Sequence, residues 1–513
     1  MKGKKMKKNW LLHLLIVLAV MSLSIGCGKA SIQEDGQEEA SITEKNDDGK
    51  EAEGKEEEED VYTVKILAFG DADTDAANAV AEAISQKTME LFQVKVELVK
   101  GYTVEQLNLM LTSGEKLDLF PAMPWEVSLT NLVSNEQIIP INELLSQYAP
   151  TTWNAVSERD WRCVTINGNI YGVPMNKEKA SSSGIIFRKD IVEELGIDYE
   201  SLKTLDQIEE VLTLVKEKTD YYPLVSNAGT LKDFLPYDDL GDGFGVLENV
   251  FEDSTTVVDW YETDSYKELC EKMYDWNQKG LIMPDAASNT DSDMTVIGAG
   301  KGFSTFGRFK PGVLNQGGAE AGTELVLTEL YPVYTKTTSV ATPWCIAANS
   351  EQPQKAMQVL DLLYNDPEMA NLFGNGIEGI HYVYTDDSRK MIDYPEGKDA
   401  GSIGYTVVSW SCPNQQITPV RVGDPLDLWD QLSQFNDEAY PSKALGFVWD
   451  NSKVLNEITA CQNVKSKYAN GLELGALDPN EALPKFIDEL KAAGIDTIVK
   501  EKQAQLDAWL AAQ

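Results

Sequence analysis

Histidine is nearly absent from this chain. The 513 residues include two histidines, His13 and His381. With so few imidazoles, a zinc site built from clustered histidines is excluded. A Ser-His-Asp triad would have to use His381, because His13 lies in the apolar segment at the N-terminus. The shortage of histidine therefore argues against the hydrolase mechanisms that depend on histidine, as a zinc ligand or as a general base.

Basic residues are also scarce in comparison with acidic ones. The chain has 44 Lys and Arg against 83 Asp and Glu, which gives a formal net charge of −39. Nucleic-acid binding depends on Lys and Arg that neutralise phosphates, and docking to anionic lipid depends on basic clusters. We therefore expect no nucleic-acid partner and no docking patch for anionic lipid. The negative charge favours solubility and repulsion from the cell surface.

The cysteines give no sign of a disulfide framework or a metal site. Five follow Cys27 in the sequence, an odd number that cannot pair completely, and none has a C-x-x-C spacing. We expect them to be core residues of a chain that does not depend on disulfides. They are Cys163, Cys270, Cys345, Cys412 and Cys461.

The N-terminus carries a short apolar run, and no later run is long enough to span a bilayer. The run from Trp10 to Val20 follows five lysines and leads through small and apolar residues to Cys27, which predicts a secretory signal. A cysteine in the first mature position resembles the lipobox of bacterial lipoproteins. That resemblance implies a signal peptide at 1–26 and a lipidated Cys27 that anchors the protein to the extracytoplasmic face of the cell membrane, as in Gram-positive bacteria. The alternative is an uncleaved signal anchor.

An acidic segment separates Cys27 from the first periodic sequence. Residues 27–60 lack apolar periodicity and are rich in Asp and Glu, a composition that predicts disorder. We interpret this segment as a spacer between the membrane and a folded body.

Strand and helix patterns alternate from Val61 onward. Tyr62–Phe69 alternates as a strand, Ala76–Phe92 has helical spacing, and Val94–Val99 alternates again. A second helical stretch, Val104–Thr112, leads to the strand Leu117–Phe120. This order predicts a parallel α/β sheet. The remaining length, about 450 residues, exceeds what one core usually supports, so we expect two lobes.

An acidic loop follows the first predicted strand. Asp71, Asp73 and Asp75, with Glu82, have part of the spacing of a calcium loop, but Ala76 stands where that loop needs glycine. We favour a loop at the carboxyl end of a parallel strand, where α/β sheets bind ligands. Its carboxylates would accept hydrogen bonds from ligand hydroxyls or cap the next helix.

Several tryptophans stand beside turn-forming residues. Trp125 and Trp344 each follow a proline, and Trp410 begins the segment Trp-Ser-Cys-Pro-Asn-Gln. Indole offers a flat apolar surface with one polar atom, which suits stacking on the C–H face of a sugar. The alternative for each tryptophan is packing in the core.

Motifs in the C-terminal half resemble those of a known family. Gly376–Tyr382 resembles the pattern G-x-E-G-x-H-Y, Pro413–Gln415 resembles P/G-N-Q, and Lys443–Phe447 resembles a recurring A-L-G-F segment. The tail from Tyr468 to Trp509 resembles a closing module of uncharacterised function. Through these segments the chain resembles the lipid-anchored, extracellular solute-binding proteins of bacterial ABC importers, of the carbohydrate type.

The resemblance implies an α/β, two-lobed periplasmic-binding-protein-like fold with chain crossings at a hinge. We expect crossings near Tyr171–Ile186 and Tyr334–Ile346. The ligand would lie between the lobes, and hinge closure would trap it. The predicted boundaries are 61–183 and 335–400 for the first lobe, and 184–334 and 401–513, with the C-terminal helices, for the second.

The resemblance also implies capture of a small solute, an oligosaccharide or sugar derivative, for delivery to the subunits of an ABC permease. No catalytic residue, cofactor or metal is expected, and the protein would be a monomer. Three alternatives stay open: a surface glycoside hydrolase, a peptide-binding receptor of the same fold, and a structural or adhesive lipoprotein. For Glu378 and His381 the alternative is a structural loop. The predicted ligand-binding residues are Asp71, Asp73, Trp125, Arg308, Trp344, Glu378, His381, Trp410, Asn414, Gln415 and Arg421.

Overall fold

The computed structural model describes residues 61–226 and 234–513. The predicted signal peptide, Cys27 and the acidic segment lie outside the described residues. Within the described ranges, no helix combines the length and the apolar character that a membrane crossing requires. The five cysteines after Cys27 are all buried and unpaired there, in agreement with their prediction as core residues.

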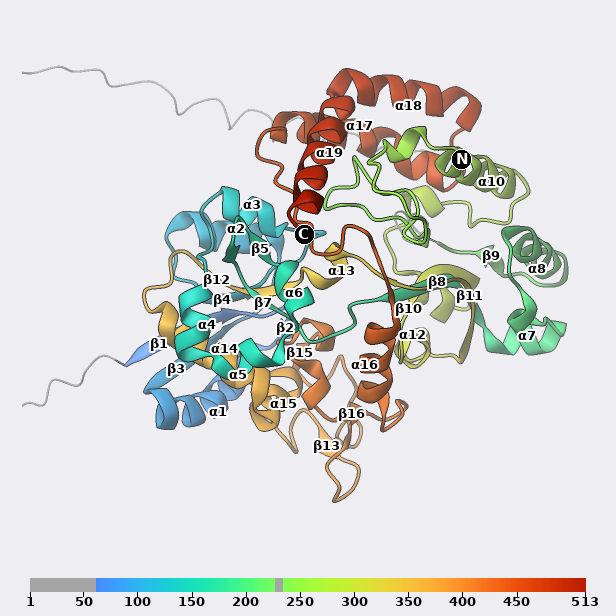
Figure 1. The fold of residues 1–513 in the computed structure, drawn as a ribbon. Helices are drawn as coiled ribbons and strands as arrows, with labels where there is room; N and C mark the ends of the chain where they lie inside the picture. Colours follow the sequence, from blue (N-terminus) through green and yellow to red (C-terminus); the bar gives the residue numbers. More distant parts are fainter. Residues whose placement is uncertain (1–60, 227–233) are drawn as a thin grey trace, which may run out of the picture. The chain divides into compact units, whose positions relative to one another are not determined.

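The first lobe is built on a five-stranded sheet with the order β3-β1-β4-β12-β7 (Figure 1). β1 runs parallel to β3 and β4, and β12 is antiparallel to β4 and β7. The predicted alternation of strands and helices at the start of the body is confirmed. The strands are β1 (Tyr62–Leu67), β3 (Val94–Val99), β4 (Leu119–Pro121), β7 (Val173–Pro174) and β12 (Pro343–Ile346).

Helices pack against this sheet because each presents an apolar face. On α1, the buried residues Ala77, Val80, Ala81 and Ile84 recur at helical spacing, and the helix ends at Gln93 in the left-handed conformation. The main helices of the lobe are α1 (Thr74–Phe92), α2 (Val104–Ser113), α14 (Pro353–Asn365) and α15 (Pro367–Asn375). Shorter ones are α3 (Leu129–Ser134), α4 (Asn142–Tyr148), α5 (Pro150–Ala155), α6 (Glu158–Arg162) and α13 (Thr337–Val340).

The second lobe contains another five-stranded sheet, in the order β17-β11-β8-β10-β9. Its central strand β8 is antiparallel to both β10 and β11. The strands are β8 (Ser181–Arg188), β9 (Tyr222–Leu224), β10 (Gly302–Phe309), β11 (Leu325–Thr335) and β17 (Tyr440–Pro441). Its helices are α7 (Lys189–Leu195), α8 (Leu205–Lys218), α11 (Asp293–Gly298) and α12 (Val313–Ala321).

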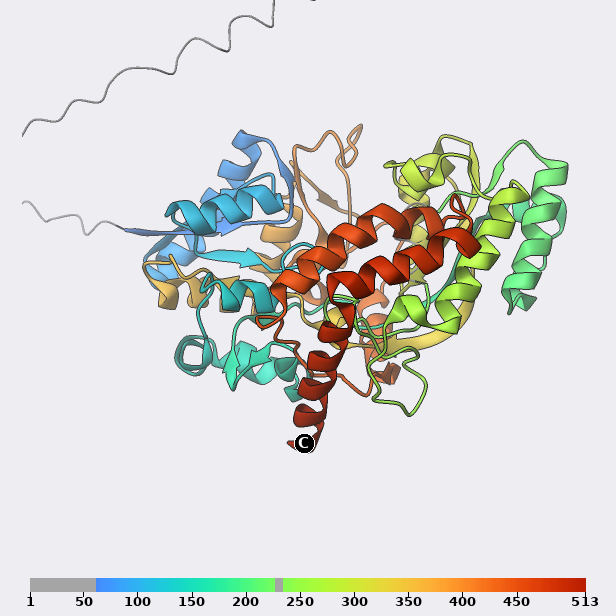
Figure 2. The same cartoon turned by 90° about the horizontal axis from the view of Figure 1, so that it is seen from above.

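The C-terminal helices enclose a separate third core. Tyr261 and Tyr266 from the middle of the chain pack there with Phe486, Leu490 and Leu506. Figure 2 shows these helices, in red, beside the green helix α10. The elements are α10 (Asp264–Gln278), α17 (Leu455–Glu473), α18 (Pro479–Ala493), α19 (Ile495–Ala511) and the short 3₁₀ helix η2 (Trp260–Glu262).

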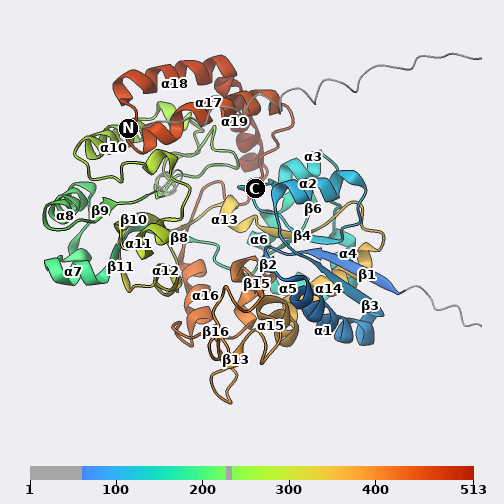
Figure 3. The same cartoon turned by 180° about the vertical axis from the view of Figure 1, so that it is seen from behind.

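The chain passes between the two sheets three times. It leaves the first sheet at β7 and enters the second at β8, and it returns between β11 and β12. Both passages fall inside the ranges 171–186 and 334–346 that the sequence indicated. The last passage contains α16 (Leu428–Glu438), which lies beside β11 (Figure 3).

The second segment of the first lobe ends later in the chain than predicted. The sequence predicts the change to the second lobe at residue 401. Tyr405 and Cys412 belong to the first core, because β15 (Tyr405–Val407) pairs with β2 (Gly70–Ala72) next to α1. The first lobe therefore continues beyond 400 to at least Cys412. The remaining small strands are β5 (Thr165–Ile166), β6 (Asn169–Ile170), β13 (Val383–Tyr384), β14 (Met391–Asp393) and β16 (Val420–Arg421).

Candidate ligand-binding site

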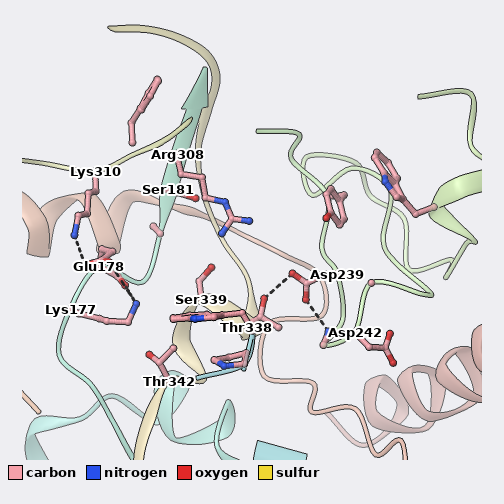
Figure 4. A pocket seen from close by; sticks show the side chains of 18 of the residues that line it. Lys177, Glu178, Ser181, Asp239, Asp242, Arg308, Lys310, Thr338, Ser339 and Thr342 are labelled. Carbon is pink, nitrogen blue, oxygen red and sulfur yellow. Dashed lines mark hydrogen bonds and ion pairs between the residues drawn. The ribbon is translucent and has the colours of Figure 1, made fainter. Parts of the chain in front are cut away.

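A cleft of about 490 Å³ lies where the two interlobe passages meet both lobes and the third core. Figure 4 shows its side chains converging from these separate parts of the chain. Such a position suits a ligand that bridges the lobes. The lining includes Trp125 from the first lobe, Lys177, Glu178, Thr338 and Thr342 from the passages, Arg308 and Lys310 from the second lobe, and Asp239 and Trp260 from the third-core side.

Glu178 is held between two lysines on one wall of the cleft. Lys310 Nζ lies 3.0 Å from its carboxylate and Lys177 Nζ lies 3.7 Å away (Figure 4). Burial raises the pKa of the Glu178 carboxyl, but the two lysines outweigh burial, so the pKa is lowered. Glu178 is therefore a fixed, ionised hydrogen-bond acceptor at neutral pH.

A second ion pair fixes the opposite side of the cleft. The buried Lys336, just before α13, donates to Asp239. Thr338 Oγ1 donates to the same carboxylate over 3.1 Å (Figure 4). The backbone N–H of Gly241 also donates to Asp239, at 2.9 Å. Burial raises the pKa of Asp239, yet Lys336 outweighs it and the pKa is lowered. The pair therefore ties the segment around Asp239 to the second passage.

Two buried polar groups line the cleft without a partner. Trp260 is 3% exposed and stacks on Tyr237, with ring centroids 4.7 Å apart, but its Nε1 has no hydrogen-bond acceptor among the described residues. Thr342 is 1% exposed, and its Oγ1 likewise has no partner in the described parts of the chain. A buried polar atom without a partner costs about 1–3 kcal/mol. Hydroxyl groups of a ligand would satisfy both atoms.

An exposed tryptophan forms the first-lobe wall. Trp125 is 60% exposed, although large aromatic side chains are usually covered. Its ring centroid lies 5.5 Å from that of Trp410, which in turn lies 5.4 Å from Phe69. Trp410 thus fixes Trp125 from the side and leaves the Trp125 ring available for stacking.

The structure brings four of the predicted site residues to the cleft or next to it. Trp125 and Arg308 line it. Trp410 contacts Trp125, and Gln415 Nε2 donates to Glu178 over 3.4 Å. These last two residues support lining residues from behind.

Trp344 and Asn414 lie in the interior of the first lobe. Trp344 is a core residue on β12 and donates from Nε1 to the carbonyl of Ser411 at 2.9 Å. Asn414 is buried and donates to the carbonyl of Tyr364 at 2.9 Å. Neither residue lines the cleft, because its polar atoms are engaged inside the lobe.

The segment containing Glu378 and His381 forms a structural loop away from the cleft. His381 is buried, and its Nδ1 accepts the backbone N–H of Ile377 at 2.9 Å. Glu378 pairs with Arg389 at 2.9 Å on the surface. Gly376 has a φ of +79° and approaches His381 so closely that a Cβ would lie 2.4 Å from Nδ1. The glycine and histidine of the motif are therefore explained by loop geometry.

The remaining predicted residues also lie outside the cleft lining. Arg421 donates to Asn375 Oδ1 at 2.9 Å. Asp71 accepts the N–H of Ala72, and Asp73 stands at the N-cap position of α1 without a side-chain cap bond. Across residues 61–226 and 234–513, no group of three or more His, Cys, Asp or Glu is placed to hold a metal ion.

Several lining residues were not predicted from the sequence, among them Lys177, Glu178, Asp239 and Trp260. Lys177 and Glu178 lie inside the first predicted crossing, so the crossing itself was the available signal. Asp239 and Trp260 lie in a stretch with little regular secondary structure, where no periodicity marks them. Lys336, the partner of Asp239, lies 97 residues away in the sequence. Tyr237, which stacks on Trp260, belongs to no recognisable pattern in the sequence.

Two lobes, crossed passages and a cleft between them define a solute-binding clamp. The model of the bacterial extracellular solute-binding protein family matches residues 72–370, and the chain belongs to this family, which confirms the predicted relationship. A domain of unknown function, DUF3502, matches residues 443–511, which include the C-terminal helices.

Known relatives span nearly the whole chain. A carbohydrate ABC transporter substrate-binding protein of Streptococcus pneumoniae is 25% identical over 474 residues, 88% of this chain and 91% of that protein. The N-glycan transport solute-binding protein NgtS of Streptococcus pneumoniae, crystallised with Man1GlcNAc, has a TM-score of 0.73 at 21% identity, covering 88% of this chain and 99% of that one. An HMO-binding, ABC-transporter-associated protein of Bifidobacterium longum infantis has a TM-score of 0.60 at 15% identity, covering 87% and 99%.

Proposed function

We propose that this chain is the extracytoplasmic substrate-binding lipoprotein of an ABC importer. It captures a neutral oligosaccharide or sugar derivative and delivers it to a membrane permease, anchored through a lipid on Cys27. Membership of the solute-binding family and the similarity to carbohydrate-transport receptors support this proposal.

The lining of the cleft is the observation that carries the proposal. The exposed indole of Trp125 lines the same cleft as Trp260 and Thr342, each of which has a buried polar atom without a partner among the described residues. A sugar ring offers the complement, an apolar C–H face for the indole and hydroxyls for the polar atoms. Arg308 and the fixed carboxylate of Glu178 add a donor and an acceptor to the lining. We assign ligand contact to these five residues.

Contacts between the first lobe and the C-terminal part support closure as the trapping motion. Thr130 Oγ1 donates to the carbonyl of Trp449 at 2.8 Å, and Asn451 Nδ2 donates to Asn131 Oδ1 at 2.9 Å. A ligand favours the closed form when it completes contacts that only this form offers. The permease would then recognise the closed lobes.

Carboxyl chemistry in the cleft argues for binding without cleavage. A glycosidase needs a general acid with a raised pKa beside a second carboxylate. The pKa values of Glu178 and Asp239 are instead lowered, because each carboxylate is paired with lysine. Neither carboxyl therefore offers a sugar in this cleft the proton that a general acid must donate.

The test is a binding screen on the protein from Cys27 onward, with manno-, malto-, fructo- and N-glycan oligosaccharides. At a free ligand concentration of 100 Kd we expect about 2.7 kcal/mol of stabilisation in thermal unfolding. Trp125→Ala should weaken binding, and Trp153→Ala, an exposed tryptophan outside the cleft lining, should not. Chromatography after incubation should show only the added sugar. Failure of every sugar to bind, or release of a cleavage product, would refute the proposal.

A further inference from the structure

A second compartment of about 650 Å³ adjoins the cleft. The two share Trp125, Gly241, Asp242, Thr338 and Lys465 in their linings, so they lie side by side around Trp125. Each alone lies within the range of about 300–1,000 Å³ typical of single small-molecule sites. Together they suit a ligand longer than one or two sugar units.

The C-terminal helix α17 supplies one wall of this second compartment. Thr459, Gln462 and Asn463 are exposed and spaced so that they share one face of the helix. The side-chain amides of Gln462 and Asn463 make no hydrogen bond to any described residue. Their donors and acceptors are uncharged, which matches hydroxyl groups better than it matches ions.

A buried amide at the base of the compartment is an independent sign of a ligand. Asn451 is 7% exposed and donates from Nδ2 to Asn131 on α3, while its Oδ1 has no partner among the described residues. Buried side-chain polar atoms usually have partners. A hydroxyl group in the compartment would supply the missing donor.

We propose that the second compartment is the distal half of one extended binding site. In this arrangement α17, part of the domain of unknown function, contacts the outer units of a neutral oligosaccharide whose inner units occupy the first cleft. The inference rests on the proposed function and adds the length of the ligand and a role for the C-terminal helices.

The experiment compares short and long probes on the double variant Gln462→Ala/Asn463→Ala. Disaccharides and hexasaccharides of the manno-, malto- and fructo- series are titrated calorimetrically. We expect about a thirtyfold loss of affinity for the hexasaccharide that binds best, from two lost hydrogen bonds, and no change for its disaccharide. Asn470→Ala, an exposed amide of the same helix that lies outside both linings, is the matched control and should leave both affinities intact.

The outcomes separate the inference from the proposed function. A hexasaccharide that binds the double variant as tightly as the native protein overturns the role of α17 and leaves the sugar receptor intact. So does a wild-type protein that binds both lengths equally, or an equal loss for both lengths. If no probe binds the wild-type protein, the proposed function fails and the inference fails with it. Equal thermal unfolding of all variants without ligand establishes that folding is unaffected.

Discussion

Trp260→Phe removes the indole N–H of Trp260, a buried hydrogen-bond donor that has no acceptor among the described residues. Phenylalanine keeps an aromatic ring to stack on Tyr237, whose centroid lies 4.7 Å from that of Trp260. The lost Nε1–H is buried and has no acceptor among the described residues, and the Trp260 side chain belongs to the lining of the cleft. If a ligand hydroxyl accepts this hydrogen bond, the substitution should weaken binding without weakening the fold.

The magnitudes of the two effects differ enough to be separated. A net hydrogen bond contributes about 1 kcal/mol, which corresponds to about a fivefold increase in Kd when it is lost. Without ligand, removal of the unsatisfied donor relieves about 1–3 kcal/mol, and the smaller ring leaves a void that costs a similar amount. The free energy of unfolding of the ligand-free protein should therefore change by less than about 1 kcal/mol.

Trp276→Phe is the matched control. Trp276 is fully buried in the second core, and its Nε1 donates to Glu209 at 2.9 Å. Breaking that bond should lower stability in urea denaturation by about 1–3 kcal/mol and leave Kd unchanged, because Trp276 does not line the cleft. Calorimetric titration with the best oligosaccharide measures Kd for both variants. Native affinity in Trp260→Phe, or a stability loss as large as that of Trp276→Phe, would refute the assignment of Nε1 to the ligand.

Three further substitutions test other parts of the structure. Burial raises the pKa of Asp259 to about 7, so its contribution to stability is fully present below pH 4 and is lost as pH rises to 7. Asp259→Asn should remove that loss and be the more stable protein at pH 8 by about 4 kcal/mol in urea denaturation, and equal stability at pH 8 would contradict it. Lys336→Met should lower stability by about 1.5–3 kcal/mol, because the half-buried Asp239 carboxylate loses its lysine and keeps the hydrogen bonds from Thr338 and Gly241. Lys336→Met/Asp239→Asn should cost less, which a double-mutant cycle measures. Gly376→Ala should destabilise the fold by about 1–3 kcal/mol through the positive φ and the clash with His381, with Kd unchanged; a change confined to Kd would place the loop at the ligand.

The sequence predicted the first lobe well because its elements have clear periods. The alternation in β1 and β3 and the helical spacing of α1 are local patterns, and they survive in the fold at nearly the predicted bounds. Clear periodicity reports which face of an element is buried. It does not report which elements from distant parts of the chain meet.

The site was predicted less completely, for a physical reason. Trp344 and Trp125 both follow proline in the sequence, but Trp344 lies on β12 between two strands of the sheet and Trp125 projects from a loop. The local sequence is similar, and only the pairing of β12 with β4 and β7 separates the two environments. Likewise, Trp260 is buried in the third core by helices that come about 200 residues later in the chain, which its local sequence does not indicate.

The distribution of charge around the cleft explains how an acidic protein can favour a neutral ligand. Several charged lining groups pair with one another or with a neighbouring lysine: Glu178 with Lys177 and Lys310, and Asp239 with Lys336. Four buried lining atoms have no partner among the described residues. Those on Trp260, Thr342 and Asn451 are uncharged, and the fourth belongs to the carboxyl group of Glu126, whose pKa is raised by burial. An anionic guest would have to break an existing ion pair or approach a chain of net charge −39, and each costs free energy. A polyhydroxylated neutral guest meets neither cost, because its hydroxyls complete hydrogen bonds that the folded protein leaves open.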